Sequence, residues 1–590
     1  MSGPEGDVSG VGDADSGATT DTTAGETATD PPDPESGVVV APERVPSPSE
    51  FAARDERGDA ADHVDGDDAT CVDDPEADAP TGTVVWHREH LRTADQPALA
   101  AAAARSDRVL PLFVFDPTFY GDRGLACDAR VAFMHDCLRD LDRQYRAACG
   151  TGLTLAHGDP VAVLERFVDA GWDVVAPLSP TGRYGLRRDE RVRERCGVRF
   201  VSGDGLVRGV DDPRENWQER VETWLTDDQY DWDPTSVAVD SIDTGVGVEQ
   251  IADTYDVTPQ KTMVPEGGTA AAWDQLAGFV DRIADYPGNI SSPVDARDGT
   301  SGLSPYLRFG CLSVRQVFQH VHDAAPACRG REMFVSRLFW NLHYRQKLED
   351  WPGWLDTACN PELEGFNAHR RDPELIAAWK DGETGFPMVD ASMRCLRETG
   401  WLNFRMRALC VSCYYHVLQQ PWWDGADYFH EHLVDSVAAI NYTQWQYQCG
   451  LVGKPTLRLY NPAKQVRDQD PDGEFVRRWV PELADLPDEH LPRPEKTPLA
   501  VQRECGVRIG EDYPYPVREF EAAKEEFWDR YEAVQPRAAA RLADPEVARR
   551  ASLSGGYDAA RAIAAEYGES DEEATGDQTS LGAFESATHR

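Results

Sequence analysis

The stretch that decides the fold class is residues 400–447, which read GWLNFRMRALCVSCYYHVLQQPWWDGADYFHEHLVDSVAAINYTQWQY. It contains an opposite-charge pair, Arg407 and Asp435, whose attraction is large only where water is excluded. Asn441 and Trp445 are four residues apart, so a helix places the amide and the indole on one face. Two further tryptophans lie just upstream. This combination suits a large redox cofactor held between helices, and it equally suits an ordinary helical core.

Other stretches along the chain agree with this block and follow one another in a consistent order. They are Val84–Arg92 with Asp95–Leu99, Gly299–Gly310, Arg337–Arg345, and Asn461–Pro462 with Asp470–Leu483. Together with residues 400–447, these stretches resemble the DNA photolyase/cryptochrome family over roughly residues 81–500. The resemblance covers that family's opening strand and turn, its phosphate-holding segment, its substrate-facing helix and its flavin-binding half.

The chain is strongly acidic. Its 590 residues carry 59 Lys and Arg against 104 Asp and Glu, a formal net charge of −45. The acid is spread through the expected folded part as well as the ends, so we interpret it as the surface of a protein from a halophilic cytoplasm; an acidic, partner-mimicking surface is the alternative. No apolar run approaches the roughly 20 residues that span a membrane, and the N-terminus lacks the apolar region of a secretory signal. We therefore expect a cytoplasmic protein without membrane association.

The 13 cysteines are scattered, and without an export signal we expect reduced thiols. Cys410 and Cys413 form a C-x-x-C pair, and some members of the family carry an iron–sulfur cluster. However, Met406, Cys410, Cys413 and Val417 form one apolar stripe at helical spacing. We therefore interpret the pair as core thiols and assign no metal site.

Residues 81–205 alternate short apolar runs with amphipathic stretches. The expected strands are Val84–Trp86, Val109–Phe115, Leu153–Leu155 and Val174–Ala176, and the expected helices are Ala98–Arg105, Asp128–Ala148 and Pro160–Ala170. Such alternation predicts an α/β domain with a doubly wound, Rossmann-like parallel sheet. A crevice at the carboxyl ends of the strands is a natural ligand site.

The remaining segments are expected to be helical or disordered. Residues 1–80 and 551–590 have few bulky apolar groups and read as disordered tails, the first of them acidic. In the helical part, Val389, Met393 and Leu396 form a stripe that stops before Gly400, which predicts a helix end there. The predicted segments are 206–268 as a connector, 269–500 as an all-α FAD-binding domain, and 501–550 as a helical extension with an exposed charged helix over Glu519–Leu542.

By resemblance, the all-α domain binds FAD. The expected contacts are Tyr286, Thr300, Ser301, Gly302, Leu303, Ser304, Arg407, Asp435, Ser436, Val437 and Asn441. Hydroxyls and backbone N–H groups of Thr300–Ser304, ahead of a helical stretch from Ser313, suit a diphosphate. Arg407 and Asp435 would lie beside the flavin ring, where a fixed cation favours the reduced anionic form. The oxygen of Asn441 would accept a hydrogen bond from N5–H of the reduced flavin, as in the family's repair enzymes.

Two positions in this set depart from the family pattern. Gly302 stands where the family usually has Arg, which removes a positive charge from the phosphate segment. Val437 stands where the family has Asp, two residues after Asp435. The first departure predicts a dinucleotide that is less tightly clamped.

Electron supply in the family uses a file of three tryptophans, and Trp445 and Trp422 match the first two. On this resemblance Trp445, Trp422 and Asn441 form the catalytic set. The third tryptophan has no match near Phe366 and His369. The alternatives for that position are Trp351, Trp354 and Trp423.

The substrate side follows the family least closely. Its expected contacts are Arg337, Trp340, Tyr344, Arg345, Phe404, Arg405 and Tyr447. Trp340 would stack on an extruded base, while Arg345 and Arg405 would meet phosphates. Arg337 replaces an acid of the repair enzymes, Phe404 an Asn and Tyr447 a Trp. Because an arginine only donates hydrogen bonds, it cannot serve a pyrimidine's N–H groups as a carboxylate does.

The resemblance implies a blue-light-driven DNA photolyase in which reduced FAD splits pyrimidine dimers by electron transfer. Cyclobutane dimers are favoured, because the paired His of relatives that act on the other main ultraviolet product is missing around Asn403 and Phe404. The family also implies an antenna chromophore, a folate or a deazaflavin, with damaged DNA as partner and a monomeric state. The alternative is a cryptochrome-like blue-light photoreceptor without repair activity, which the altered substrate side favours and Asn441 opposes.

Overall fold

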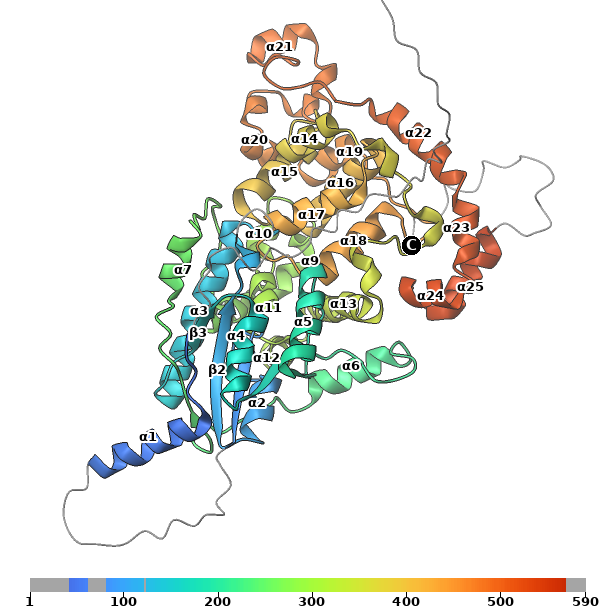
Figure 1. The fold of residues 1–590 in the computed structure, drawn as a ribbon. Helices are drawn as coiled ribbons and strands as arrows, with labels where there is room; N and C mark the ends of the chain where they lie inside the picture. Colours follow the sequence, from blue (N-terminus) through green and yellow to red (C-terminus); the bar gives the residue numbers. More distant parts are fainter. Residues whose placement is uncertain (1–41, 62–80, 121–123, 569–590) are drawn as a thin grey trace, which may run out of the picture. The chain divides into compact units, whose positions relative to one another are not determined.

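The computed structural model describes residues 42–61, 81–120 and 124–568, drawn as a ribbon in Figure 1. Residues 1–41, 62–80 and 569–590, which were predicted to be disordered, lie outside the described residues. Among the described residues, no helix has both the length and the apolar character needed to cross a membrane.

The N-terminal domain is built on a parallel sheet. Its strands are β1 (Gly82–His87), β2 (Arg108–Phe115), β3 (Thr154–His157), β4 (Asp173–Pro177), β5 (Arg199–Val201) and β6 (Ala238–Val239). The strand order is β3-β2-β1-β4-β5, and β6 pairs with the start of β2. The chain therefore winds outward from β1 in one direction and from β4 in the other, which confirms the doubly wound sheet.

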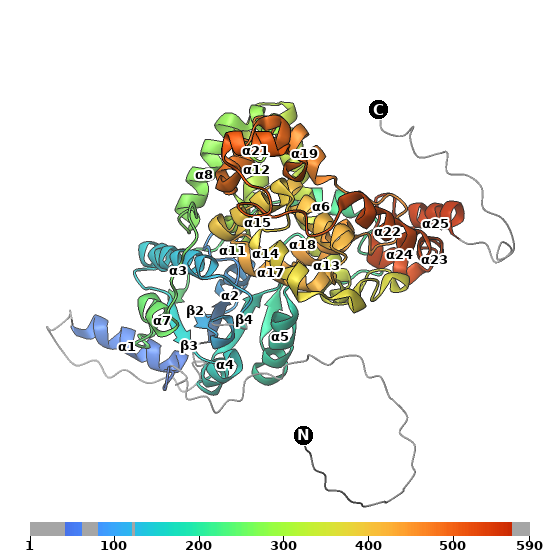
Figure 2. The same ribbon diagram turned by 90° about the horizontal axis from the view of Figure 1, so that it is seen from above.

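Helices cover both faces of this sheet because its central strands are apolar on both sides. Val85 and Val109 pack in one cluster with Leu138, whereas Val84 and Leu110 pack in another. Figure 2 shows α3 and α4 on opposite sides of the strands. The covering helices are α2 (Pro97–Ala103) and α3 (Asp128–Cys149) on the first face, and α4 (Pro160–Asp169) and α5 (Arg183–Cys196) on the second.

The predicted connector has regular structure. It contains α6 (Trp217–Thr226), α7 (Val248–Thr254) and strand β6, which joins the sheet. Val221, Val237 and Ile251 are buried in the same core as the first face of the sheet. The sequence analysis did not predict these elements, because the few apolar residues that pack into the core lie within the mostly polar stretch 206–268.

Part of the predicted N-terminal tail is also ordered, so that prediction is wrong for α1 (Pro48–Ala61). The ring of Phe51 packs edge-on against Trp172 with centroids 5.9 Å apart. The indole N–H of Trp172 donates to the carbonyl of Pro46 at 2.8 Å. A few apolar side chains thus fix this segment on the α/β domain, and composition averaged over 80 residues does not reveal them.

From Thr269 onward the described chain is helical, as predicted. The helices are α8 (Thr269–Arg282), α9 (Tyr286–Asn289), α10 (Ala296–Gly299), α11 (Ser304–Phe309), α12 (Val314–Ala324), α13 (Arg329–Asp350), α14 (Pro373–Asp381), α15 (Pro387–Thr399), α16 (Phe404–Ser412), α17 (Trp422–His432), α18 (Ala438–Cys449), α19 (Pro462–Gln469), α20 (Glu474–Trp479), α21 (Leu499–Cys505), α22 (Phe520–Glu532), α23 (Gln535–Arg541), α24 (Pro545–Ala551) and α25 (Gly556–Tyr567). Helix α15 ends directly before Gly400, where the sequence predicted its end.

The stripe through Cys410 and Cys413 lies in the helical core. Met406, Cys410, Cys413 and Val417 are all fully buried, and the helix continues from α16 into a π-helical turn over Cys413–Val417. Burial raises the pKa of both thiols, which keeps them protonated. The two cysteines therefore behave as small apolar side chains of the core.

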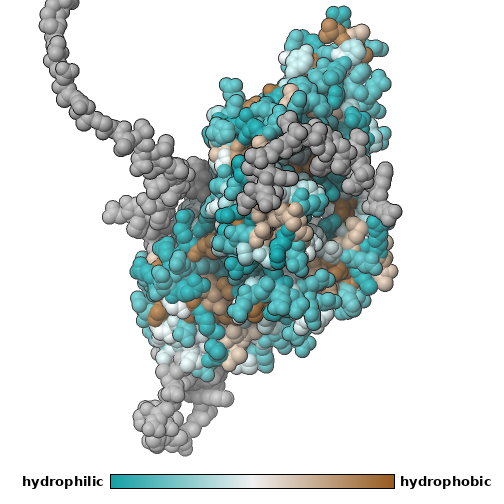
Figure 3. Space-filling view, turned by 90° about the vertical axis from the view of Figure 1, so that its right-hand side faces the viewer, coloured by the Kyte–Doolittle hydropathy of each residue, from teal (hydrophilic) through white to brown (hydrophobic). Residues whose placement is uncertain are grey.

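The C-terminal part differs from its prediction in two ways. The expected single exposed helix over Glu519–Leu542 is two helices, α22 and α23, with Pro536 in the first turn of the second. Its apolar residues Phe527 and Tyr531 are buried in the helical core. Helix α25 is ordered within the tail predicted to be disordered, because Ala560 packs into the same core. The face shown in Figure 3 is mostly hydrophilic with scattered apolar patches.

Candidate functional site

The predicted ion pair forms between α16 and the loop after α17. Arg407 Nη2 donates to both carboxylate oxygens of Asp435, at 3.0 and 3.1 Å. Arg407 Nε also donates to the carbonyl of Leu402 at 2.7 Å, which fixes the guanidinium. The Asp435 side chain is 6% exposed and that of Arg407 25%. The pair is thus held at the rim of the core, in a setting where its attraction is stronger than in water.

Asn441 and Trp445 lie in α18, as their spacing predicted. The amide nitrogen of Asn441 donates to the carbonyl of Ala426 at 2.9 Å. This bond fixes the amide and leaves its oxygen as an acceptor. The buried Trp445 Nε1 has no hydrogen-bond partner among the described residues. Because buried polar atoms are normally paired, an unpaired indole N–H beside a fixed amide fits a site that holds a polar ring system.

The phosphate segment connects α10 to α11. Thr300 follows α10 and Ser304 begins α11, so the six-residue α11 comes before the helical stretch that was expected from Ser313. Gly302 has φ 62°, and a Cβ there would lie 2.7 Å from Nε2 of Gln275. That same nitrogen donates to the carbonyl of Ser301 at 2.8 Å. The position therefore has no room for the family's Arg unless Gln275 moves.

A positive charge beside this segment comes from a residue that the sequence analysis missed. Arg282, in the last turn of α8, donates to the carbonyl of Asp298 at 3.0 Å and to that of Thr300 at 3.2 Å. A cavity of about 420 Å³ adjoins the segment and is lined by Arg282, Asn289 and Gly299 among others. Arg282 thus supplies the cation that Gly302 lacks. The sequence does not reveal this role of Arg282, because Arg282 and Thr300 are 18 residues apart and become neighbours only in the fold.

The remaining predicted flavin contacts lie in different surroundings. Tyr286 is buried at the start of α9, and its hydroxyl is hydrogen-bonded by Arg337. Leu303 is buried, while Ser436 Oγ lies 2.7 Å from Nδ1 of His430. Val437 lines a second pocket at the carboxyl edge of the sheet. The residues predicted to contact the flavin therefore do not all line one pocket.

The two predicted electron-transfer tryptophans have different neighbours. Trp445 packs edge-on against Trp379 and Phe429, with ring centroids 6.1 and 5.3 Å away. Trp422 contacts Trp423, with centroids 6.4 Å apart. The sequence analysis missed Trp379, because nothing local distinguishes it from an ordinary core tryptophan. The order of electron transfer among these rings stays a prediction.

The expected substrate contacts include two large exposed aromatic side chains. Trp340 is 45% exposed and Phe404 56%. Trp340 stacks on Tyr344 with centroids 5.6 Å apart, which holds the indole in place. Tyr447 accepts a hydrogen bond from Lys454 at 3.0 Å, and Arg337 is exposed. Exposed aromatic rings beside basic side chains suit a ligand that stacks and carries negative charge.

The environment of Arg345 differs from the exposed one expected for a phosphate contact. Its side chain is buried beside Glu89 of the α/β domain rather than exposed to a DNA backbone. Arg405, by contrast, is half-buried and donates to the hydroxyl of Ser291 at 3.2 Å, next to Phe404. Tyr344, the residue before Arg345, is also buried, but it packs against Trp340 and not beside Glu89.

A second pocket, of about 340 Å³, opens at the carboxyl ends of β1, β2 and β4, where an open α/β sheet binds ligands. Among the described residues it is lined by six arginines and two acids: Arg88, Arg130, Arg183, Arg187, Arg188, Arg308, Glu89 and Asp116. Arg88 and Arg188 pair with Asp189, Arg308 with Glu89, and Arg183 with Asp356 and Asp427, so part of this positive charge is already compensated. Arginine still exceeds acid among the lining residues. The pocket therefore suits an anionic ligand.

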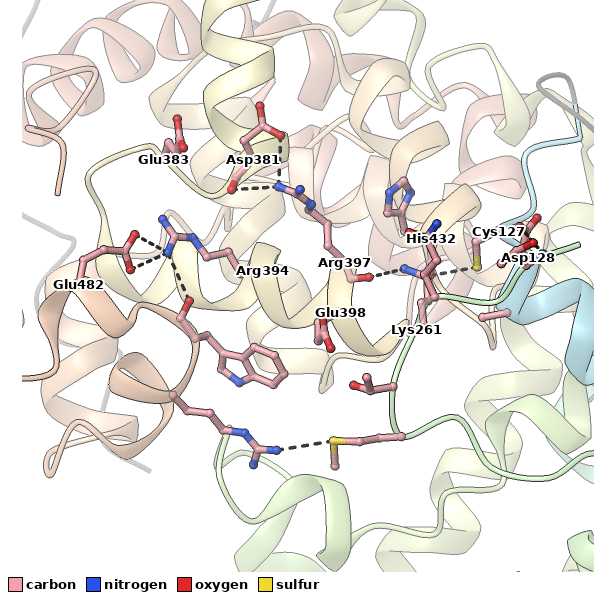
Figure 4. Close-up of a pocket in the computed structure, with 17 residues that line it drawn as sticks. Cys127, Asp128, Lys261, Asp381, Glu383, Arg394, Arg397, Glu398, His432 and Glu482 are labelled. Carbon is pink, nitrogen blue, oxygen red and sulfur yellow. Dashed lines mark hydrogen bonds and ion pairs between the residues drawn. The ribbon is translucent and has the colours of Figure 1, made fainter. Parts of the chain in front are cut away.

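A groove of about 1040 Å³ contains none of the predicted site residues (Figure 4). Three of its basic side chains engage a carboxylate or a backbone carbonyl. Arg394 binds Glu482 at 2.7 Å and Arg397 binds Asp381 at 3.2 Å. Lys261 donates to the carbonyl of Arg397 at 2.7 Å. With these three side chains engaged in this way, the groove indicates no particular ligand.

Comparison with known proteins gives consistent matches. The family model "DNA photolyase" matches residues 83–208, and "FAD binding domain of DNA photolyase" matches residues 334–533. The deoxyribodipyrimidine photo-lyase of Synechococcus sp. is 30% identical over 495 residues, which cover 78% of this chain and 98% of that protein. Cryptochrome-2 of Arabidopsis thaliana is 29% identical over 489 residues, which cover 75% of this chain and 77% of that protein.

A solved structure is similar in fold. The archaeal photolyase of Sulfolobus tokodaii, described with two FAD molecules and a novel light-harvesting cofactor, matches with a TM-score of 0.64 at 25% identity. The match covers 77% of this chain and 100% of that chain. Photolyases and cryptochromes therefore both occur among the relatives.

Proposed function

This chain belongs to the DNA photolyase/cryptochrome family and carries its FAD-binding domain, and from that premise we propose that it is a blue-light-driven DNA photolyase. The observation that carries the proposal is the fixed amide of Asn441, which offers only its oxygen as an acceptor because its nitrogen is bound to Ala426. In the family an Asn at this position accompanies repair.

We assign the flavin's contacts to the residues that the site brings together. The Arg407–Asp435 pair would stabilise negative charge on the ring system, and Thr300, Ser301 and Arg282 would hold the diphosphate. When bound, reduced flavin supplies a light-excited electron to the dimer and takes it back, so no net oxidation results. The protein's own part is orientation and electrostatics. Asn441 accepts a hydrogen bond without giving up a proton, which keeps the reduced state from being protonated further by this side chain.

The two exposed aromatic rings support a lesion site. Trp340 and Phe404 expose apolar surface that a flipped dinucleotide would cover. Tyr344 holds the Trp340 indole by stacking, so little side-chain entropy is lost on binding. A cyclobutane dimer stacks poorly in the duplex, which lowers the free energy needed to extrude it.

The proposal is tested with flavin-loaded, chemically reduced protein and an oligonucleotide that contains one thymine dimer. Under blue light we expect intact thymines, measured by chromatography of the digested product, and no change in the dark. An unchanged dimer in a sample whose absorption shows reduced flavin would refute repair.

A pair of variants separates electron supply from repair. Trp445→Phe is expected to slow the light-driven reduction of oxidised flavin, while chemically reduced Trp445→Phe still repairs. Trp528→Phe, a change on α22, serves as the matched control and should alter neither rate. Equal photoreduction in all three proteins would remove Trp445 from the electron path.

We propose that the arginine-lined pocket at the sheet edge holds the antenna chromophore. Its six arginines support an anionic chromophore such as a folate with glutamates or a phosphate-bearing deazaflavin. Excess candidate chromophore added to the protein should give a bound absorption band that Arg183→Ala weakens. A band of equal strength in wild type and variant would place the chromophore elsewhere.

A cryptochrome-like photoreceptor is the second candidate, and Arg337 is the observation that favours it. An exposed guanidinium here replaces the carboxylate that repair enzymes direct at pyrimidine N–H groups. Dark binding separates the two functions. A preference for dimer-containing DNA over undamaged DNA of at least tenfold supports repair, whereas equal affinity together with normal flavin photoreduction supports the receptor.

A further inference from the structure

A small cavity of about 30 Å³ lies between the α/β domain and the helical domain. Glu89, His90 and Arg92, which follow β1, line one side. Arg308 and Gly310, at the end of α11, and Arg345 on α13 line the other. The walls are close: Gly310 has φ 65°, and a Cβ there would lie 2.5 Å from the backbone of His90.

Four N–H groups of the lining residues are buried without an acceptor. They are Nε of Arg92, Nε of Arg308, Nε of Arg345 and Nε1 of Trp224. Arg92 is 2% exposed and Arg345 9%, so bulk water does not satisfy them. Buried donors that lack an acceptor cost free energy. Their concentration around one cavity therefore indicates a missing acceptor there.

The carboxylates at the cavity are already engaged. Glu89 is paired with Arg308. Asp204 accepts from both terminal nitrogens of Arg208, at 2.6 and 3.0 Å. Glu89 also lies near Arg345 and Arg88, so this one carboxylate is shared among three guanidinium groups.

The remaining groups leave an excess of positive charge. Arg345 has no hydrogen bond or ion pair within residues 42–61, 81–120 and 124–568. Arg92 donates to two backbone carbonyls, of Gly310 at 2.9 Å and of Asp95 at 2.6 Å. His90 is uncharged, because burial together with Arg92 and Arg345 holds its pKa well below the usual range. Arg345 thus shares Glu89 with Arg308, Arg92 shares Asp95 with Arg315, and neither guanidinium has a carboxylate of its own.

We propose that this cavity binds a monovalent inorganic anion of the size of chloride. A single water occupies about 10–15 Å³ of such volume, so the cavity has room for one chloride ion or about two waters. Waters would accept from the four donors but would leave both guanidinium groups without a counter-charge of their own in a region of low dielectric constant. An anion satisfies the donors and the charge together.

The anion would join three segments that are distant in the sequence: the turn after β1, the end of the phosphate segment, and α13. Arg345 then acts as an anion ligand inside the protein, which explains why it is buried while Trp340 on the same helix is exposed. Bound only by the folded state, the anion stabilises that state in proportion to the logarithm of its concentration. The inference does not depend on repair activity.

Bromide replaces chloride and scatters anomalously, so crystals of the full chain grown in sodium bromide give a direct test. We expect an anomalous peak within hydrogen-bond distance of Arg92 and Arg345. An empty cavity, or one that contains only ordered water at high bromide concentration, would overturn the proposal.

Thermal unfolding at fixed ionic strength gives the second test, with sodium chloride exchanged against sodium gluconate, whose anion is too large to enter. Above the dissociation constant, each tenfold rise in chloride should raise the Tm by about 1 °C, given an unfolding entropy of about 2 cal/mol/K per residue. Inorganic phosphate in place of chloride should give no such rise. A Tm that follows ionic strength alone would contradict a specific site.

Arg345→Gln should remove the chloride dependence, while Arg458→Gln, an exposed arginine away from the cavity lining, should keep it. An unchanged chloride dependence in Arg345→Gln would contradict the assignment. If Arg345→Gln does not fold, the bromide peak in the wild-type crystals decides the question.

Discussion

The residues predicted to face the flavin and those predicted to face a DNA lesion are organised in opposite ways. On the flavin side, Arg407, Asp435 and Asn441 are largely buried and already hydrogen-bonded to the protein. On the lesion side, Trp340 and Phe404 are about half exposed and Arg337 has no carboxylate partner among the described residues. The residues of the flavin side are held in place by protein contacts before a flavin binds. The exposed rings of the lesion side would be covered only when DNA binds.

The difference has a physical reason. A permanently bound cofactor requires its contacts to be desolvated only once, when the protein folds. Buried ion pairs and fixed amides are therefore tolerated at a cofactor site. A transient, anionic ligand must be met by groups that remain hydrated and soluble until contact. Three departures from the family pattern, Arg337, Phe404 and Tyr447, are on the transient side, and two, Gly302 and Val437, are on the flavin side.

The largest effect should follow from breaking the organised side. Asp435→Asn removes the counter-charge of Arg407, and breaking a buried pair costs about 3–5 kcal/mol. Arg407 is 25% exposed, so we expect the lower end, roughly a hundredfold loss of FAD affinity. Flavin absorbance per protein after titration measures it. Asp381→Asn, which breaks the exposed pair with Arg397, should retain full flavin content.

A smaller effect is expected on the open side from Trp340→Ala. Stacking on one base contributes about 1–3 kcal/mol, so the affinity for dimer-containing DNA in the dark should fall about tenfold or more. Flavin content should not change. Leu499→Ala removes another exposed apolar side chain, 67% exposed, and is the control. Loss of flavin from Trp340→Ala would mean that the two sides are not separate.

Arg337→Glu sharpens the comparison by restoring the residue type of the repair enzymes. A carboxylate can accept from a pyrimidine N–H, and one such hydrogen bond is worth about 1 kcal/mol. The ratio of affinities for damaged and undamaged DNA should therefore rise about fivefold. Arg329→Glu makes the same change of charge at an exposed position of the same helix, and should lower both affinities without changing their ratio.

The smallest effect concerns salt. The net charge of −45 repels DNA, and the lesion face offers few basic groups, among them Arg337, Arg405 and Lys454. Since each neutralised phosphate adds about 0.9 to the slope of log affinity against log salt, we expect a slope of magnitude below about 3. Fluorescence anisotropy across a salt series measures it. A slope near 8 would mean that charge, not stacking, dominates binding.

Much of this organisation could be predicted from the sequence. Alternating apolar runs gave the parallel sheet, and the spacing of Asn441 and Trp445 gave their common helix. Arg345 shows the limit. It follows Tyr344 in a stretch that resembles a substrate-facing helix, yet a helix turns by about 100° per residue, so neighbouring side chains face different surroundings. Local pattern alone does not say which face meets the α/β domain.

Arg282 and the ordered tail segments also could not be predicted from local sequence patterns. Arg282 acts beside Thr300 only because α8 runs past the phosphate segment, and α1 and α25 are ordered because a few apolar side chains find pockets on distant segments.

The amino-acid sequence by itself determined the fold class and the residue types of the flavin side, since hydrophobic period and residue spacing are local properties of a chain. Only the tertiary structure decided which arginines are buried, which are exposed and which gather around a cavity. Burial and pairing depend on segments that meet in space, as Glu89, Arg308 and Arg345 do, and no local pattern encodes that meeting.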